Sequence, residues 1–275
     1  MLSLLLLILS IGGTVGAYLL FPSLSLWLLL PIFLAAYVGA VVLYFVFLVL
    51  SAPFLPMKKP IKKPNAYCRF MIGTTMNWLM GLLRIRVKLI HAEKLPQEPC
   101  VIVSNHRSDF DPMTMLAVLR RRKLAYISKK ENFKLPLVGC YIYHAGFISI
   151  DRENSRRAVM ALQTAAERMR ETGVDIGIYP EGTRSKTGKL LRFKTGAYLL
   201  AQKANAPIVV MTTSGTDRIF KGWPFRSSHV ELEVLEVIDK ERVQAMTLDA
   251  LADYSRALIE KKLYPETEQG NEHAD

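Results

Sequence analysis

The first 57 residues contain no charged side chain and are predominantly apolar. Residues 2–20 alone, as an α-helix that rises about 1.5 Å per residue, are long enough to cross a hydrocarbon core of about 30 Å. Phe21-Pro22-Ser23 interrupts this run, and a second apolar run continues to residue 50, with Pro31 suited to the first turn of a helix. The pattern predicts a transmembrane helical hairpin over residues 1–57.

A secretory signal peptide is the alternative interpretation of this segment. It lacks a basic start, it is too long, and no convincing small-residue cleavage site precedes the second apolar run. The hairpin is followed directly by Lys58, Lys59, Lys62 and Lys63. Because basic residues beside a membrane helix mark the cytoplasmic side and attract anionic lipid, we expect an integral membrane protein whose following domain lies on the cytoplasmic face.

Residues 58–84 form a basic juxtamembrane segment in which aromatic and apolar side chains recur with helical spacing between Tyr67 and Leu83. Such a helix either packs into the core of the following domain or lies along the bilayer surface, since Trp and Tyr favour that depth. The sequence leaves both interpretations open.

From residue 85 the pattern changes to alternating strands and helices. Residues 85–89 alternate between apolar and charged side chains, which predicts a strand with one buried face. The apolar spacing over residues 158–169, with Asn154 or Ser155 as cap and Gly173 as terminator, predicts a helix. Further strands are expected at 101–103, 124–127, 174–179, 207–212 and 230–234, the last with Glu231 and Glu233 on a solvated face, and further helices at 113–120, 195–203 and 248–261. These elements give an α/β domain over residues 85–245, followed by a C-terminal helix and polar tail over residues 246–275.

The charge balance narrows the possible partners. The chain carries 36 Lys and Arg against 24 Asp and Glu, a net charge of +12. Nucleic acid is the usual partner of such a surplus, but no recognition helix or aromatic stacking motif is present, so anionic lipid or a phosphorylated substrate is favoured. Three cysteines without short-range pairing exclude a disulfide framework and a tetrahedral cysteine zinc site, and they indicate a reducing compartment.

The first candidate site is Asn105-His106-Arg107-Ser108-Asp109-Phe110-Asp111-Pro112, between a buried strand and a helix. On one continuous helix His106 and Asp111 would lie about 140° apart, so the chain must bend if they are to meet. Pro112 at the first helical position, with Asp111 or Asp109 as cap, provides that bend. A carboxylate bonded to one imidazole nitrogen prepares the other to act as a general base. Alternatively, Asp111 only caps the helix and His106 is a surface histidine.

The second candidate is Tyr179-Pro180-Glu181-Gly182-Thr183-Arg184-Ser185, again after an apolar strand. Gly182 permits close approach of the backbone, and Arg184 offers a planar donor fork suited to a phosphate. A plain turn with a solvated ion pair is the alternative. A phosphate-binding P-loop is excluded, because five residues rather than four separate Gly182 from Gly188 and Leu190 stands where Ser or Thr would bind magnesium.

A third motif, residues 146–152, is a short strand that ends in Arg152. With Lys129 and other upstream lysines it adds positive charge near the candidate site. The five histidines are scattered without paired ligand spacing, so we predict no metal site. The nucleophile elbow Gly-x-Ser-x-Gly and the dinucleotide fingerprint do not occur in the sequence.

Taken in order, these motifs resemble the 1-acylglycerol-3-phosphate acyltransferase family of membrane enzymes. The resemblance covers about residues 85–237 and rests on four motifs in order: Asn105-His106 followed by Asp111, residues 146–152, Glu181-Gly182-Thr183-Arg184, and Ala206-Pro207-Ile208-Val209. Ser149 and Val210 depart from the family pattern. These departures bear on which substrate the protein prefers more than on which reaction it catalyses. The fold implied is the glycerolipid acyltransferase-like α/β fold, a mixed central sheet flanked by helices.

The resemblance implies transfer of a fatty acyl group from acyl-CoA or acyl carrier protein to the sn-2 hydroxyl of lysophosphatidic acid. His106, oriented by Asp111, would act as general base. Glu181 would either orient Arg184 or contact the glycerol. The expected partners are the lysophospholipid acceptor, the acyl donor and membrane lipids, with no cofactor and no nucleic acid. The residues expected to bind substrate are Asn105, Lys129, Arg152, Glu181, Gly182, Thr183 and Arg184.

Three alternatives stay open on the sequence. The acceptor could be another lysophospholipid, glycerol-3-phosphate or an aminoacyl lipid. The protein could be a catalytically silent lipid-binding member of the same fold. The third alternative is a membrane-tethered protein that binds nucleic acid. This alternative predicts salt-sensitive retention of DNA or RNA.

Overall fold

The computed structural model describes residues 2–57, 61, 63–185 and 188–265. Lys58, Lys59 and Lys62 of the predicted basic cluster lie outside the described residues, whereas Lys63 is described and exposed. The predicted polar tail also lies outside them from residue 266 onward.

Two apolar helices form the N-terminal part. Helix α1 (Leu2–Leu20) packs against α2 (Leu29–Ser51), and short 3₁₀ turns, η1 (Leu26–Leu28) and η2 (Ala52–Phe54), flank α2. The stretches Leu2–Leu20 and Leu26–Phe54 are long and apolar enough to cross a membrane by length and composition. The predicted hairpin is therefore confirmed as a structural unit, with Pro31 in the first turn of α2 as expected.

Within the described residues, seven strands form one sheet in the order β1-β7-β6-β2-β5-β3-β4. Neighbouring strands run parallel, except that β6 and β7 are antiparallel, so the predicted mixed sheet is confirmed. The strand bounds are β1 (Ile85–Ile90), β2 (Val101–Ser104), β3 (Leu124–Lys129), β4 (Ile148–Ile150), β5 (Asp175–Ile178), β6 (Ile208–Ser214) and β7 (Ser228–Ile238).

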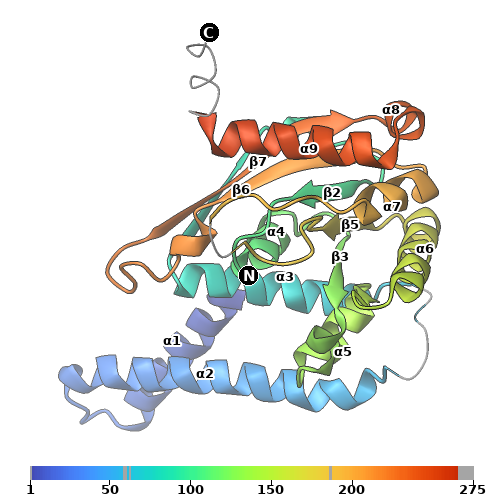
Figure 1. Cartoon of the computed structure of the whole chain (residues 1–275). Coiled ribbons are helices and arrows are strands. Elements are labelled where there is room, and N and C mark those ends of the chain that lie inside the picture. Colours follow the sequence, from blue (N-terminus) through green and yellow to red (C-terminus); the bar gives the residue numbers. More distant parts are fainter. Residues whose placement is uncertain (1, 58–60, 62, 186–187, 266–275) are drawn as a thin grey trace.

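Helices cover both faces of the sheet (Figure 1). One face carries α3 (Ala66–Leu82), α4 (Phe110–Val118) and α5 (Val138–Ala145), and α1 and α2 lie beyond this layer. The other carries α6 (Ser155–Thr172), α7 (Gly196–Ala204), α8 (Lys240–Ala245) and α9 (Leu248–Leu263). Short 3₁₀ turns, η3 (Ala92–Lys94), η4 (Lys130–Lys134) and η5 (Thr216–Arg218), connect these elements.

Helix α3 joins the N-terminal hairpin to the α/β domain. Cys68 and Met80 of α3 are buried in the main core, so the core-packing interpretation holds, although Phe70 and Leu82 stay exposed. Helices α3 and α5 are also joined to α2, between Tyr37 and Ser51, by three hydrogen bonds: Trp78 Nε1 to Tyr37 Oη at 3.1 Å, Tyr44 Oη with Thr75 Oγ1 at 2.6 Å, and Ser51 Oγ with Tyr141 Oη at 2.5 Å.

Helix α6 shows how local signals set its ends. The Asn154 side chain accepts a hydrogen bond from the Arg157 N–H at 3.0 Å, and Gly173 takes a left-handed conformation with φ of 64°. Asn satisfies an orphan N–H at a helix start, and Gly adopts positive φ without steric cost. Both predicted end signals are confirmed.

The structure differs from the expected elements in four places. Helices α5 and α8 were not expected, and the core extends beyond residues 85–245 to Leu251 and Ile259 of α9. The expected solvated face of β7 is exposed at Glu231 but buried at Glu233, where Lys262 of α9 lies 2.8 Å from the carboxylate. A helix packed over the strand removes that position from solvent, which strand alternation alone does not reveal.

Candidate active site

The polar motifs meet at one edge of the sheet. Strands β2, β5, β3 and β4 run parallel to one another, and so do β2 and β6, so their carboxyl ends lie along the same edge. The segment 105–111 follows β2, the segment 179–184 follows β5, and Thr216 follows β6. Lys129 ends β3 and Arg152 follows β4, which places all predicted site residues at this edge.

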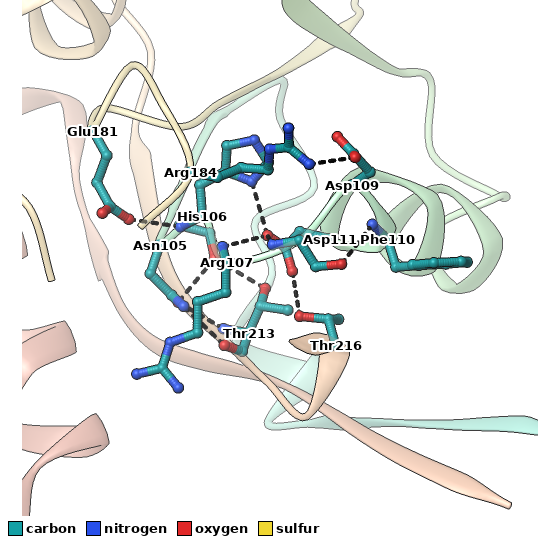
Figure 2. Close-up of polar contacts among 12 residues, drawn as sticks. Asn105, His106, Arg107, Asp109, Phe110, Asp111, Glu181, Arg184, Thr213 and Thr216 are labelled. Carbon is teal, nitrogen blue, oxygen red and sulfur yellow. Dashed lines mark hydrogen bonds and ion pairs between the residues drawn. The ribbon is translucent and has the colours of Figure 1, made fainter. Parts of the chain in front are cut away.

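His106 and Asp111 are in direct contact (Figure 2). His106 Nδ1 lies 2.8 Å from Asp111 Oδ2, with the imidazole 16% exposed and the carboxylate fully buried. Because an ionised carboxylate only accepts hydrogen bonds, this contact assigns the proton to Nδ1 and leaves the lone pair on Nε2. The predicted contact between the two side chains is therefore confirmed.

Four donors surround the Asp111 carboxylate. Besides His106, Oδ2 accepts the backbone N–H groups of Arg107 at 2.7 Å and Ser108 at 2.8 Å. On the other side, Oδ1 accepts the Thr216 hydroxyl at 2.5 Å. Hydrogen bonds to the charged form of a buried carboxylate offset its desolvation, so this shell holds the anion in one orientation.

The helix start differs from the prediction. Helix α4 begins at Phe110, so the N-cap position belongs to Asp109, one of the two residues expected there, and Asp111 and Pro112 lie within the first turn. Asp109 precedes the helix without a side-chain cap bond, and Ser108 Oγ accepts the Phe110 N–H at 3.2 Å. Asp111 instead reaches back to the preceding backbone, and this contact bends the chain so that His106 meets it.

Tyr179 fixes the plane of the imidazole. The two rings lie nearly parallel, 16° apart, with centroids separated by 4.2 Å. Tyr126 stacks on the other side of Tyr179, with centroids 5.6 Å apart. Gly177 makes room for this row, because a Cβ there would lie 2.4 Å from a Tyr126 ring carbon. The row of rings limits the tilt of His106 away from Asp111.

Glu181 holds the backbone of the two motifs together. Its Oε1 accepts the His106 N–H at 2.6 Å, and Oε2 accepts the Leu191 N–H at 3.0 Å. Of the two alternatives for Glu181, the structure does not support orientation of Arg184, because Arg184 forms an ion pair with Asp109; the glycerol contact stays a prediction. Burial raises the pKa of the Glu181 carboxyl above its ordinary value, and the two backbone hydrogen bonds oppose that rise.

Asn105 has a structural position. It is almost fully buried, and its Nδ2 donates to the Thr213 carbonyl at 2.8 Å while its Oδ1 accepts the Thr213 N–H at 2.8 Å. These paired bonds join the ends of β2 and β6. The amide therefore supports the backbone of the site, and the substrate contact expected for Asn105 stays a prediction.

The predicted cationic residues reach the site from different strands. Arg152 Nη1 donates to the Gly182 carbonyl, which draws the end of β4 toward the loop after β5. Gly182 has a φ of 71°, a left-handed backbone conformation that glycine adopts without steric cost, which explains the glycine. Thr183 and Lys129 are exposed at the same edge, and within the described residues no hydrogen bond joins either side chain to His106 or Asp111.

A cavity of about 390 Å³ lies beside this motif. Its lining includes Arg107, Arg184 and Asp217 together with Ser185 and Gly188. Arg107 also donates from Nη2 to the Tyr264 hydroxyl at 2.9 Å and to the Gly188 carbonyl at 3.1 Å. Two guanidinium groups at one cavity form a site suited to an anionic group such as a phosphate.

Sequence reasoning did not identify Thr216, and it placed Tyr179 and Asp109 in the candidate motifs without the contacts that they make in the structure. Their partners come from other segments, so no local spacing identifies them. The position of Tyr179 two residues before Glu181, at the end of a strand, was the one available signal. In the described part of the chain, no group of three or more His, Cys, Asp or Glu side chains could hold a metal ion.

The comparisons agree with this arrangement. The family model described as Acyltransferase matches residues 86–214. Human 1-acyl-sn-glycerol-3-phosphate acyltransferase beta is 40% identical over 157 residues, and the Haemophilus influenzae 1-acyl-sn-glycerol-3-phosphate acyltransferase is 28% identical over 198 residues. The crystal structure of the 1-acyl-sn-glycerophosphate (LPA) acyltransferase PlsC from Thermotoga maritima superposes with a TM-score of 0.62 at 26% identity.

The matches differ in how much of each protein they cover. The human alignment spans 56% of this chain and 56% of the relative, and the Haemophilus alignment spans 70% and 81%. The Thermotoga structure covers 80% of this chain and 90% of its own. The region matched by the family model ends at residue 214. It therefore contains His106, Asp111 and their partners up to Thr213, but not Thr216. Along the region matched by the Acyltransferase model, the chain is similar to 1-acyl-sn-glycerol-3-phosphate acyltransferases, and it spans about 56–62% of the length of the first of these relatives.

Proposed function

We propose that this protein transfers a fatty acyl group from an acyl thioester, either acyl-CoA or acyl carrier protein, to the sn-2 hydroxyl of lysophosphatidic acid, forming phosphatidic acid. The observation that carries the proposal is the contact between His106 Nδ1 and Asp111 Oδ2 at the carboxyl edge of the sheet. The names of the similar proteins support the same acceptor.

In the proposed mechanism, His106 Nε2 takes the proton from the acceptor hydroxyl as its oxygen attacks the thioester carbonyl carbon. Collapse of the tetrahedral intermediate breaks the C–S bond, and the proton passes from Nε2 to the leaving thiolate. Asp111 stabilises the imidazolium that forms in between. A general base contributes about 10²- to 10⁴-fold in rate. The thioester is already activated, so the reaction requires neither a cofactor nor an acyl-enzyme.

We propose that Arg184 and Arg152 hold the acceptor phosphate, with Lys129 as a weaker contributor. Arg184 lines the 390 Å³ cavity, and its ion pair with Asp109 is largely exposed to solvent. Exposed ion pairs contribute about 0–1 kcal/mol, so a phosphate can displace Asp109 at little cost. Positioning the phosphate brings the neighbouring hydroxyl against His106, which lowers the entropic part of the barrier.

The apolar hairpin would hold the site at the membrane, where acceptor and product dissolve. Contacts between α2 and the α3–α5 layer extend from Tyr37 to Ser51, about 21 Å along the helix axis. A helix that stands across the bilayer below the domain does not contact it over such a length. We therefore propose that α1 and α2 are embedded alongside the domain in one leaflet, on the cytoplasmic side.

The decisive assay uses the purified full chain with both acyl donors. The acceptors are lysophosphatidic acid, glycerol-3-phosphate and lysophosphatidylcholine. We expect transfer to lysophosphatidic acid in preference to the other two. Equal use of acceptors with and without a terminal phosphate would contradict the roles of Arg152 and Arg184, and no transfer from either donor would favour a silent lipid-binding protein.

A further inference from the structure

The segment that precedes β7 carries three aromatic side chains on the protein surface. We call residues 219–226 the aromatic loop. Phe220 is 63% exposed, Trp223 is 44% exposed and Phe225 is 87% exposed. Large apolar side chains cost free energy in water, and a cluster of them indicates a surface that meets a partner.

The backbone of the aromatic loop is held in place. Ile219 is buried, and its carbonyl accepts the Ser228 hydroxyl at 2.7 Å. The Arg226 N–H donates to the Gly222 carbonyl at 2.8 Å. The outward direction of the aromatic side chains is therefore built into the loop, which presents them without further ordering of its backbone.

The charge of the aromatic loop and its flank is positive. Arg218, Lys221 and Arg226 lie among the aromatic residues, and residues 218–226 contain no acidic side chain. Asp217, just before them, lies 3.8 Å from Arg218. Aromatic side chains favour the depth of the lipid headgroups, and basic side chains are attracted to anionic lipid. This combination matches an anionic bilayer surface.

The aromatic loop lies between the anchor and the candidate site. Arg84, just beyond the C-terminal end of α3, donates from Nη1 to the Pro224 carbonyl at 3.3 Å. Helix α3 in turn contacts α1 and is joined to α2 by side-chain hydrogen bonds. Phe220 makes an edge contact with Phe110, the residue before Asp111, with centroids 5.5 Å apart. Figure 1 shows the loop projecting beyond the sheet at the end of α3, away from α6.

We propose that the aromatic loop inserts into the lipid–water interface of an anionic membrane as a second contact, separate from the α1–α2 hairpin. Asp217, which lines the 390 Å³ cavity with Arg107 and Arg184, directly precedes the loop and its basic flank. Insertion therefore holds the mouth of this cavity at the membrane surface. The proposal does not depend on acyl transfer, because lipid contact is measured without turnover.

Tryptophan fluorescence tests the insertion directly. The chain contains three tryptophans, so the variant Trp27→Phe/Trp78→Phe retains Trp223 as the sole emitter. It is reconstituted in vesicles of phosphatidylcholine and phosphatidylglycerol, with and without brominated acyl chains that quench on contact. We expect bromination to lower Trp223 emission by about twofold, and by less when phosphatidylglycerol is omitted.

The matched control retains only Trp27, which is 90% exposed at the turn of the hairpin. Quenching of Trp27 without quenching of Trp223 would overturn the aromatic loop as a lipid contact while leaving the anchor intact. A second contrary outcome is that Trp223 becomes shielded from solvent when the chain self-associates in lipid-free detergent, while it is not quenched in the brominated vesicles. This outcome would assign the loop to a protein–protein contact and overturn the proposal as well.

A second measurement needs no tryptophan variant. A phospholipid with a diazirine in its acyl chain near the headgroup is photolysed with the native full chain, and the labelled peptides are mapped. We expect adducts within residues 219–226 and none at Met160 on α6, which is 64% exposed and serves as the control. Adducts confined to α1 and α2 would overturn the proposal. Phe225→Asp should lower loop labelling by about tenfold, whereas Met160→Asp should not.

Discussion

Thr216 donates its hydroxyl to Asp111 Oδ1 at 2.5 Å, on the side of the carboxylate opposite His106. Thr216 and Asp111 lie 105 residues apart in sequence. Thr216 therefore acts as a positioning residue. It holds the Asp111 carboxylate in place, and this carboxylate in turn orients the His106 imidazole. A hydrogen bond to a charged group contributes about 1.5–3 kcal/mol.

Thr216→Val removes this hydrogen bond with little change in shape. We expect kcat to fall by about tenfold with little change in the KM of the acceptor, because the substrate contacts remain. Thr216→Ser should restore most of the rate, since it keeps the hydroxyl. Thr164→Val on the exposed side of α6 is the control. An unchanged kcat for Thr216→Val would contradict the positioning role.

Arg184→Gln and Arg152→Gln should each weaken binding of the acceptor phosphate. We expect the KM for lysophosphatidic acid to rise by about tenfold or more, because a charge-assisted hydrogen bond is lost. The preference for lysophosphatidic acid over monoacylglycerol should fall by a similar factor. Arg156→Gln on α6 provides the comparison, and an unchanged preference in both site variants would assign the phosphate to other residues.

The pKa of Glu181 has a consequence for stability. Burial raises it in the folded chain, so the folded state holds the proton more tightly than the unfolded state. Unfolding then releases a proton in the window just above the ordinary value of 4.5, and stability falls as the pH rises through this window. Relative to Glu181→Gln, the native chain should be most stable near the lower end of the window, as measured by thermal unfolding from pH 4.5 to 7. A gain in relative stability with rising pH would contradict this assignment.

Gly177→Ala should disturb the row of rings behind His106. The new Cβ would lie 2.4 Å from the Tyr126 ring, which must shift and displace Tyr179. Overpacking of this kind costs about 1–3 kcal/mol. We expect a lower melting temperature together with reduced activity. Gly81→Ala on α3 meets open space and should leave both nearly unchanged. Equal behaviour of the two variants would mean that the row does not hold His106.

Local patterns predicted the elements whose ends carry their own signals. Helix α6 is one example, because Asn154 and Gly173 mark its ends. Helix α5 was missed because Val, Ile, Tyr and Gly disfavour an isolated helix, and its stability comes from packing against α3. Gly139 in α5 is required by contact with Phe133, since a Cβ would lie 2.1 Å from its carbonyl oxygen. Such a constraint is visible only after the chain has folded.

The same division applies to the candidate site. The bend that joins His106 to Asp111 could be predicted, because both residues lie within one short motif. Glu181 was recognised as a site residue, but its partners are backbone N–H groups of His106 and Leu191. The pairing of Asp109 with Arg184 likewise joins two motifs 75 residues apart. Contacts between segments follow from the strand order, which the sequence pattern did not specify.

The central claim is that His106 is the general base. The test compares acyl transfer to lysophosphatidic acid by the native full chain and by His106→Ala, both reconstituted in vesicles with matched amounts of folded protein. We predict that His106→Ala loses at least about 10²-fold in kcat while its melting temperature and membrane association match those of the native chain. Turnover by His106→Ala within a few-fold of the native rate would contradict the account.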